Sequence, residues 1–238
     1  MKIFVTGDTH SDLSKVTEMY DAITAEKTTD GIPHVDRFDY LIHCGDYRKD
    51  ASELSRRLGL PAVCVYGNCD DVWEADFDIL DTPAGSIVVT HGHVEDVNNT
   101  HDGLYALAED QGCNCICYGH THIPVYGEEN GYLVINPGSP AKPLDGTKGS
   151  CAILTADENG YSGEIVYYQA LLDGRKAAKS DDSDNGPKSD DSNDSPKSDD
   201  SNDSPKPDDS KTEGKQAPKK SGSFGGFLRK IFNYSDGQ

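Results

Sequence analysis

The chain has 238 residues, of which 42 are Asp or Glu and 22 are Lys or Arg, so its net charge is −20. A negative field of this size repels polyanions and argues against broad binding to nucleic acids. Residues 1–172 hold 28 acidic and 10 basic residues, a balance of −18, and nearly all of the aliphatic runs. A segment of this length is enough for one hydrophobic core, so we expect one folded domain over residues 1–172.

The seven cysteines are an odd number, and no charged segment followed by an apolar run opens the chain. We therefore expect no secreted disulfide framework, and a cytoplasmic protein. No apolar run approaches the ~18–20 residues that span a bilayer. Cys113, Cys115 and Cys117 alternate with the period of a strand, which predicts one shared face. Two interpretations stay open for them: small buried apolar residues, or a metal or redox role.

The first half of the chain alternates predicted strands with predicted helices, and the second half is rich in strands without helices between them. This order predicts an α/β sandwich with mixed sheets. Residues 28–38 are expected to form a loop, and residues 71–82 give no clear pattern. We expect strands at 2–6, 40–44, 62–66, 86–90, 115–118, 125–127, 131–135, 150–155 and 163–168, and helices at 14–23, 50–58 and 100–110.

The C-terminal part differs in composition. Residues 173–223 contain a nine-residue repeat of Ser, Asp, Lys and Pro, with copies that begin at Lys188 and Lys197, and nothing apolar to bury. A disordered linker is therefore expected. Residues 224–234 instead place five apolar side chains at helical spacing, which predicts a short amphipathic segment. Docking on a partner protein or on its own domain, weak contact with a membrane surface, and no defined role all remain open for this segment. The five are Phe224, Phe227, Leu228, Ile231 and Phe232.

Five apolar runs end on side chains that can bind metals. In open α/β sheets the carboxyl ends of the strands converge on one crevice, where ligands bind. Imidazole, carboxylate and amide oxygen together suit Mn, Fe, Ni, Co or Zn. Seven such ligands exceed what one ion needs, and a carboxylate can bridge two ions about 3.5–4 Å apart. The candidate ligands are Asp8, His10, Asp46, Asn68, His91, His120 and His122, with Asp70 and His93 close to them in the sequence.

The ordered motifs D-x-H, G-D, G-N-x-D, H-G-H and G-H-T-H, followed by N-P-G-S, resemble the calcineurin-like metallophosphoesterase superfamily. The resemblance covers about residues 1–170 and is strongest to the small YfcE-type phosphodiesterases. It implies a four-layer α/β/β/α sandwich of two mixed sheets, with the C-terminal tail outside it. It further implies two divalent metal ions, with Mn preferred and Ni, Fe, Co or Zn accepted, and with Asp46 bridging them. One ion would be held by Asp8, His10, Asp46 and His122, and the other by Asp46, Asn68, His91 and His120.

The resemblance also implies in-line attack of a metal-bridging hydroxide on a phosphate ester, with Asp46, Asn68, His91, Asp70 and His93 as the catalytic residues. Many members of the superfamily have a histidine where this chain has Cys69. A thiol is a poor acid at neutral pH, so either good leaving groups are favoured, or His93, metal-bound water or the substrate supplies the proton to the leaving group. Asp70 is expected to orient His91 or Asn68.

Some residues near the motifs have open or supporting roles. His43 and Cys44, which precede Asp46, are expected to pack or to orient ligands. Asn136 and Ser139, in the N-P-G-S block, either face the site or cap the turn.

Two functions compete. The first is a phosphodiesterase, favoured over a monoesterase, that acts on a small substrate. The alternative is a non-catalytic metal-binding scaffold, resembling the phosphoesterase-like subunit of retromer, in which residues 224–234 bind a partner. The chain retains every expected metal ligand, which favours the enzyme. A homo-oligomer is left open by the sequence.

Overall fold

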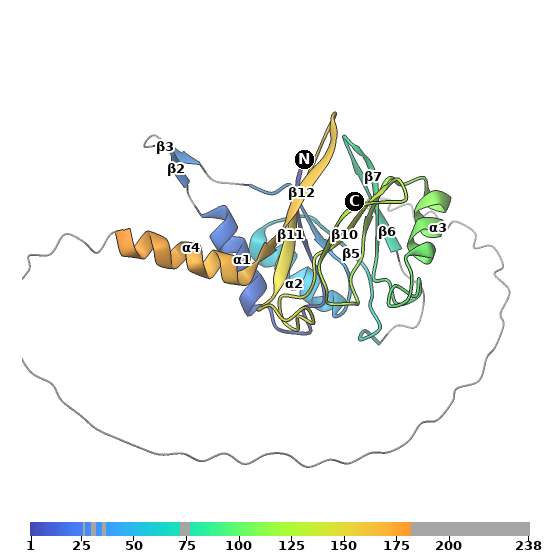
Figure 1. Cartoon of the computed structure of the whole chain (residues 1–238), viewed down its shortest axis with the longest axis horizontal. Helices are drawn as coiled ribbons and strands as arrows, with labels where there is room; N and C mark the ends of the chain where they lie inside the picture. Colours follow the sequence, from blue (N-terminus) through green and yellow to red (C-terminus); the bar gives the residue numbers. More distant parts are fainter. Residues whose placement is uncertain (26, 30–31, 35–36, 72–76, 182–238) are drawn as a thin grey trace, which may run out of the picture. The chain divides into compact units, whose positions relative to one another are not determined.

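The computed structural model of the chain describes residues 1–25, 27–29, 32–34, 37–71 and 77–181. Two five-stranded sheets form its centre (Figure 1). The strand order of the first sheet is β12-β11-β1-β4-β5, in which β1, β4 and β5 are parallel. Its strands are β1 (Lys2–Thr6), β4 (Tyr40–His43), β5 (Ala62–Cys64), β11 (Ser150–Asp157) and β12 (Gly160–Tyr167).

The second sheet has the order β6-β7-β8-β10-β9, and its three central strands are parallel. The outer strands β6 and β9 pair antiparallel with their neighbours. Both sheets are therefore mixed, as the sequence predicts. The strands are β6 (Phe77–Thr82), β7 (Gly85–Thr90), β8 (Cys115–Cys117), β9 (Val125–Glu129) and β10 (Tyr132–Asn136).

Helices cover the outer face of each sheet. An apolar cluster that includes Val16, Met19 and Leu54 packs three helices against the first sheet, and one that includes Leu104 and Ala108 packs α3 against the second. The four layers of the predicted α/β/β/α sandwich are confirmed. The helices are α1 (Ser14–Thr24), α2 (Arg48–Leu58) and α4 (Tyr168–Asp181) on one side and α3 (Asp102–Gln111) on the other (Figure 1).

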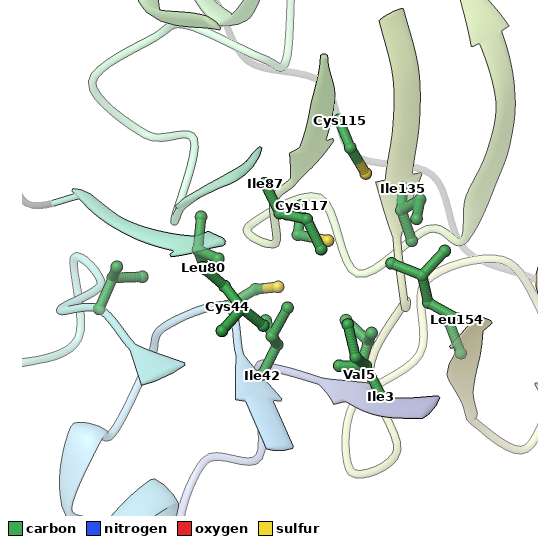
Figure 2. Close-up of a cluster of buried hydrophobic side chains, with 13 residues drawn as sticks. Ile3, Val5, Ile42, Cys44, Leu80, Ile87, Cys115, Cys117, Ile135 and Leu154 are labelled. Carbon is green, nitrogen blue, oxygen red and sulfur yellow. The ribbon is translucent and has the colours of Figure 1, made fainter. Parts of the chain in front are cut away.

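The two sheets pack face to face through a layer of small and branched side chains. Ile3 and Ile42 of the first sheet and Ile87 and Ile135 of the second are fully buried in this layer (Figure 2). The pattern is that of parallel strands that are covered on both faces, which require continuous apolar runs. The layer therefore fixes how the strand ends of one sheet face those of the other.

All three cysteines of the triplet are buried, but they do not share one face as the sequence predicts. Cys115 and Cys117 lie in the layer between the sheets (Figure 2). Cys113 precedes β8 and packs in the cluster beneath α3 instead. The alternation of a strand cannot place Cys113 because the strand begins only at Cys115.

Three segments differ from the prediction in secondary structure. Residues 71–82, which gave no pattern, contain the edge strand β6. The expected loop at 28–38 overlaps the short antiparallel pair β2 (Lys27–Thr29) and β3 (Ile32–His34). Helix α4 was not predicted, and it continues past the proposed domain boundary at residue 172. Most of the predicted linker at 173–223, and all of the amphipathic segment at 224–234, lie outside the described residues.

Candidate metal centre

The candidate ligands follow the carboxyl ends of five strands. Parallel pairing aligns Thr6 with His43, and His43 with Cys64, so the turns that follow β1, β4 and β5 lie at one edge of the first sheet. In the second sheet, Val89 is aligned with Cys117, so the turns after β7 and β8 lie together. The first sheet carries Asp8, His10, Asp46 and Asn68 on these turns, and the second carries His91, His120 and His122.

The backbone is strained at several of the candidate ligands. Nine non-glycine residues in the described part of the chain have a positive φ, and five of them are predicted ligands. Such conformations are unfavourable for residues with a Cβ and cluster at functional sites. The strain is consistent with turns selected to aim side chains. The five are Asp8, His10, Asp46, His120 and His122, with φ between 47° and 70°.

Four of the predicted ligands form one tight group. The donor atoms of Asp8, His10, Asp46 and His122 all lie within 4.8 Å of one another. The Nε2 atom of His10 is 3.1 Å from Nε2 of His122 and 3.4 Å from Oδ2 of Asp46. Asp8 and Asp46 are almost completely buried.

A second group lies on the other side of Asp46. The Nε2 atom of His91 is 3.3 Å from Oδ1 of Asp46 and 3.0 Å from Oδ1 of Asn68. The same oxygen of Asn68 lies 2.8 Å from Nδ1 of His120. Asp46 therefore presents one carboxylate oxygen to each group.

The ring nitrogens of His91 and His122 that face away from the donor groups lie near main-chain carbonyls. These contacts orient the other ring nitrogen toward the donor groups. Nδ1 of His91 lies 2.8 Å from the carbonyl of Cys44, and Nδ1 of His122 lies 2.7 Å from the carbonyl of Lys142. A carbonyl only accepts, so each Nδ1 carries a proton, and the Nε2 atom of the neutral ring faces the centre without one.

The inward-facing atoms are left without enough hydrogen-bond donors. Oδ1 of Asp8 is buried, lies 3.2 Å from Nε2 of His122 and makes no hydrogen bond of ordinary geometry. Nε2 of His91 likewise faces two acceptor oxygens, those of Asp46 and Asn68. Buried acceptors that face one another without a donor are costly unless a cation lies among them. The donor set therefore fits divalent cations that accept nitrogen and oxygen ligands.

The protonation preferences of the site also suit cations. Burial lowers the pKa of His10 and of His120, which keeps both rings neutral near pH 7. Burial opposes ionisation of Asp46, but His91 and the backbone N–H of Cys69 outweigh it and lower the pKa of this carboxyl. Neutral imidazole and ionised carboxylate are the forms that bind metals. His122 differs: burial disfavours its proton, but the adjacent carboxylate of Asp8 outweighs burial and raises its pKa.

Asp70 has a different position from the one expected. Its carboxylate accepts hydrogen bonds from the backbone N–H groups of Tyr47, Arg48 and Gly67, at 2.8–3.1 Å. Among the described residues, these hydrogen bonds reach neither the ring of His91 nor the amide of Asn68. Asp70 thus ties the turn that carries Asn68 to the turn that carries Asp46.

The turn that carries Asp8 and His10 is supported from beneath. The hydroxyl of Thr9 donates to Asp50 at 2.7 Å and lies 3.0 Å from Nε2 of the buried His43. Burial lowers the pKa of His43 to about 4, so this ring is neutral. As expected, His43 supports a ligand loop and takes no part in the group itself.

The N-P-G-S block holds two ligand loops in place. The amide of Asn136 donates to the carbonyl of Gly119 at 2.9 Å, and the hydroxyl of Ser139 donates to the carbonyl of Asp8 at 2.8 Å. Asn136 also accepts from the backbone N–H of Gly138, as a turn cap does. Of the two interpretations, the cap is confirmed for Asn136, and both residues also support the loops.

Cys69 and His93 lie beside the ligand groups. Burial, together with a hydrogen bond to Asp46, raises the pKa of Cys69 to about 11, so its thiol stays protonated at neutral pH. The ring of His93 is 5.3 Å from that of His91 and 6.2 Å from that of His120. Its Nδ1 atom is buried without a hydrogen-bond partner, and burial lowers its pKa.

One residue at the site was missed by the sequence analysis. The side-chain amide of Asn98 lies 2.9 Å from Nε2 of His120. Asn98 belongs to a loop, follows no strand and matches none of the motifs. Its proximity to His120 is a tertiary contact that no local sequence pattern encodes.

Three comparisons place this chain among known proteins. The model of the calcineurin-like phosphoesterase superfamily domain matches residues 1–159. The probable metallophosphoesterase YsnB of Bacillus subtilis is 35% identical over 163 residues, which are 67% of this chain and 86% of YsnB. Phosphodiesterase MJ0936 of Methanocaldococcus jannaschii is 27% identical over 187 residues, 70% of this chain and 99% of MJ0936. A single mutant of Vps29 from Entamoeba histolytica superimposes with a TM-score of 0.54 over 70% of this chain and 99% of that one; at 19% identity this shows the fold alone.

Proposed function

Because the chain belongs to the calcineurin-like phosphoesterase superfamily, we propose that it is a binuclear metal-dependent phosphodiesterase. The observation that carries the proposal is the pair of donor groups that share Asp46, one oxygen to each. MJ0936 and YfcE of Escherichia coli, both named phosphodiesterases, support diesters as substrates. Mn²⁺ is the proposed metal, with Ni²⁺, Fe²⁺, Co²⁺ or Zn²⁺ as substitutes.

Each ligand has a proposed place. Asp8, His10 and His122 hold one cation and Asn68, His91 and His120 the other, with Asp46 between them. Two bound cations would supply the positive charge that binds phosphate oxygens and acidifies a water molecule. In a domain as acidic as this one, that charge is what allows a phosphate ester to approach.

The chain's own residues position and protonate the substrate. Asn68 contributes a neutral oxygen and so adds no charge that would repel phosphate. Cys69 keeps its proton near neutral pH and is a weak acid, so we assign proton delivery to the leaving group to His93. The position of His93 supports this assignment, because its ring lies 5.3 Å from that of His91 and 6.2 Å from that of His120.

Hydrolysis of two substrates tests the proposal. Metal-stripped full-length protein is assayed with bis(p-nitrophenyl) phosphate and with p-nitrophenyl phosphate, and each divalent metal is added back. We expect Mn²⁺ to restore turnover of the diester above that of the monoester. Asp46→Asn should reduce turnover at least ~100-fold, since it weakens both donor groups. Binding of two cations without turnover of either ester would instead favour the non-catalytic scaffold.

The C-terminal part is proposed to act outside catalysis. No helix in the part of the chain that the structure describes is both long and apolar enough to cross a bilayer. We propose that residues 224–234, linked by residues 182–223, bind a protein partner. Removing residues 182–238 should leave kcat for the diester unchanged, and a large loss of kcat would show that the tail belongs to the catalytic unit.

A further inference from the structure

We propose that Asn98 is a positioning residue for His120: its side-chain amide binds Nε2 of the ring and so directs Nδ1 at the cation shared with Asn68 and His91. The inference rests on the proposed binuclear centre and adds a residue to it. His120 stands with its two ring nitrogens between two amides. Nδ1 lies 2.8 Å from Oδ1 of Asn68, and Nε2 lies 2.9 Å from the amide of Asn98.

The hydrogen bonds to the outer ring nitrogens of His91 and His122 indicate the role of Asn98. His91 and His122 have their outer nitrogens fixed by main-chain carbonyls, those of Cys44 and Lys142. Histidine ligands generally need such a partner, because it selects the tautomer and the ring orientation. At His120 a side chain takes the place of the carbonyl. Its contribution can therefore be removed by substitution without breaking the backbone.

An amide differs from a carbonyl because it can also donate. In the structure, Nδ1–H of His120 can donate to Oδ1 of Asn68 while Nε2 accepts from Nδ2 of Asn98. When Nδ1 is a metal ligand, the ring proton must sit on Nε2, and a half-turn of the Asn98 amide presents its oxygen to that proton. Asn98 can thus partner both tautomers, whereas a carboxylate could partner only the one that binds metal.

The loop that presents Asn98 is anchored on both sides of it. Val97 is 6% exposed and packs in the cluster beneath α3. The backbone N–H groups of Asn99 and Thr100 both donate to the carbonyl of Asp96. Asn98 itself is exposed, yet the residues around it are held.

The loop is also tied to the segment between β8 and His120. Nε2 of His101 lies 3.0 Å from the hydroxyl of Tyr118, two residues before His120. Nδ1 of His101 lies 2.7 Å from Glu129, and Glu129 also accepts from the hydroxyl of Tyr105. The separation between Asn98 and His120 is therefore set by two fixed supports.

Metal binding is the first test. Metal-stripped full-length protein is titrated calorimetrically with MnCl₂. Loss of an outer partner of a histidine ligand typically costs 10–100-fold in metal affinity. We expect Asn98→Ala to weaken one of two binding steps by about tenfold or more, and Asn98→Asp to restore or exceed wild-type affinity. Asn99→Ala is the matched control, since the Asn99 side chain bonds Asp96 and no histidine, and it should bind as wild type.

A spectroscopic readout separates positioning from a general structural effect. In the metal-free protein, the ¹⁵N shifts of the His120 ring should report Nδ1–H in the wild type and Nε2–H in Asn98→Asp, because a carboxylate only accepts. The melting temperature of Asn98→Ala should stay close to that of Asn99→Ala.

Two results would overturn the inference in different ways. If the wild type binds two cations and Asn98→Ala binds both with the same affinity, Asn98 does not position His120. The proposed binuclear centre would be unaffected by that result. A wild-type protein that binds no pair of cations would overturn the proposed function, and this inference with it.

Discussion

The Nε2 atom of His122 faces the buried Oδ1 of Asp8 at 3.2 Å, and that oxygen makes no hydrogen bond of ordinary geometry. A cation or a proton between them resolves the conflict. Replacing Asp8 by Asn removes the charge and keeps the size, so we expect the protein to bind one Mn²⁺ instead of two. Calorimetric titration gives the number. Asp12→Asn is the control, because Asp12 is exposed in the same loop and its carboxylate accepts from Ser14 and from no candidate ligand among the described residues. Two bound ions in Asp8→Asn would exclude Asp8 as a ligand.

Asp70→Ala tests the link between two ligand turns. The substitution leaves three backbone N–H groups, those of Tyr47, Arg48 and Gly67, without their acceptor. We expect the free energy of unfolding to fall by about 2–4 kcal/mol in the metal-free protein. Urea unfolding measures this loss, with Asp71→Ala, the next residue along the chain, as control. Equal stability of the two variants would show that water replaces the carboxylate at no cost.

Gly119→Ala should disrupt the first donor group by crowding. A Cβ at residue 119 would lie 2.6 Å from Oδ2 of Asp8 and 2.7 Å from the carbonyl of Cys44. Because the second contact is with the backbone, the chain cannot relieve it by turning a side chain. We expect loss of Mn²⁺ binding and of diester turnover. Gly127→Ala is the control, since a Cβ there meets nothing within 4 Å. Full activity in Gly119→Ala would mean that the Asp8 loop moves freely.

The buried ring of His43 predicts a pH dependence of stability. Burial lowers its pKa from 6.5 to about 4, so between these values the unfolded chain binds a proton that the folded protein does not. Stability therefore falls as the pH falls through this window. Between pH 7 and pH 4.5 the loss due to His43 should be about 2–3 kcal/mol.

His43→Gln isolates this contribution, since glutamine does not titrate there. Urea unfolding of metal-free wild type and variant at the two pH values gives the difference between their losses of unfolding free energy. The contributions of the other histidines are the same in both proteins and cancel. A pH dependence as steep in the variant as in the wild type would assign the effect elsewhere.

The fold, and the gathering of the candidate ligands at one edge of the sheets, could be predicted because both depend on local patterns. In the runs that end on Asp8, Asp46 or His91, the apolar residues predict a strand. The polar residue that follows predicts a side chain at the end of that strand. The edge strand β6 could not be found in this way. It holds charged and apolar residues together, and its pairing with β7 makes it a strand.

The supporting residues depend on tertiary contacts that no local pattern encodes. Asn98 meets His120 only because β8 and the loop after β7 come together. Asp70 was expected to orient a ligand side chain, but in the structure it binds backbone. Spacing in the sequence identifies the residue types that can bind metal, and the partner of each residue depends on how the turns pack.

The donor groups draw on both sheets, whose strands form no common ladder. The sheets meet through an apolar layer (Figure 2), which contributes packing but no hydrogen-bond ladder between them. Cations held jointly by Asp46 of one sheet and His91 or His122 of the other would cross-link the two sheets at this end of the sandwich. Removal of metal should then accelerate amide hydrogen exchange in β4, β7 and β8 together. Metal binding would then control both the rigidity of the domain and its catalytic activity.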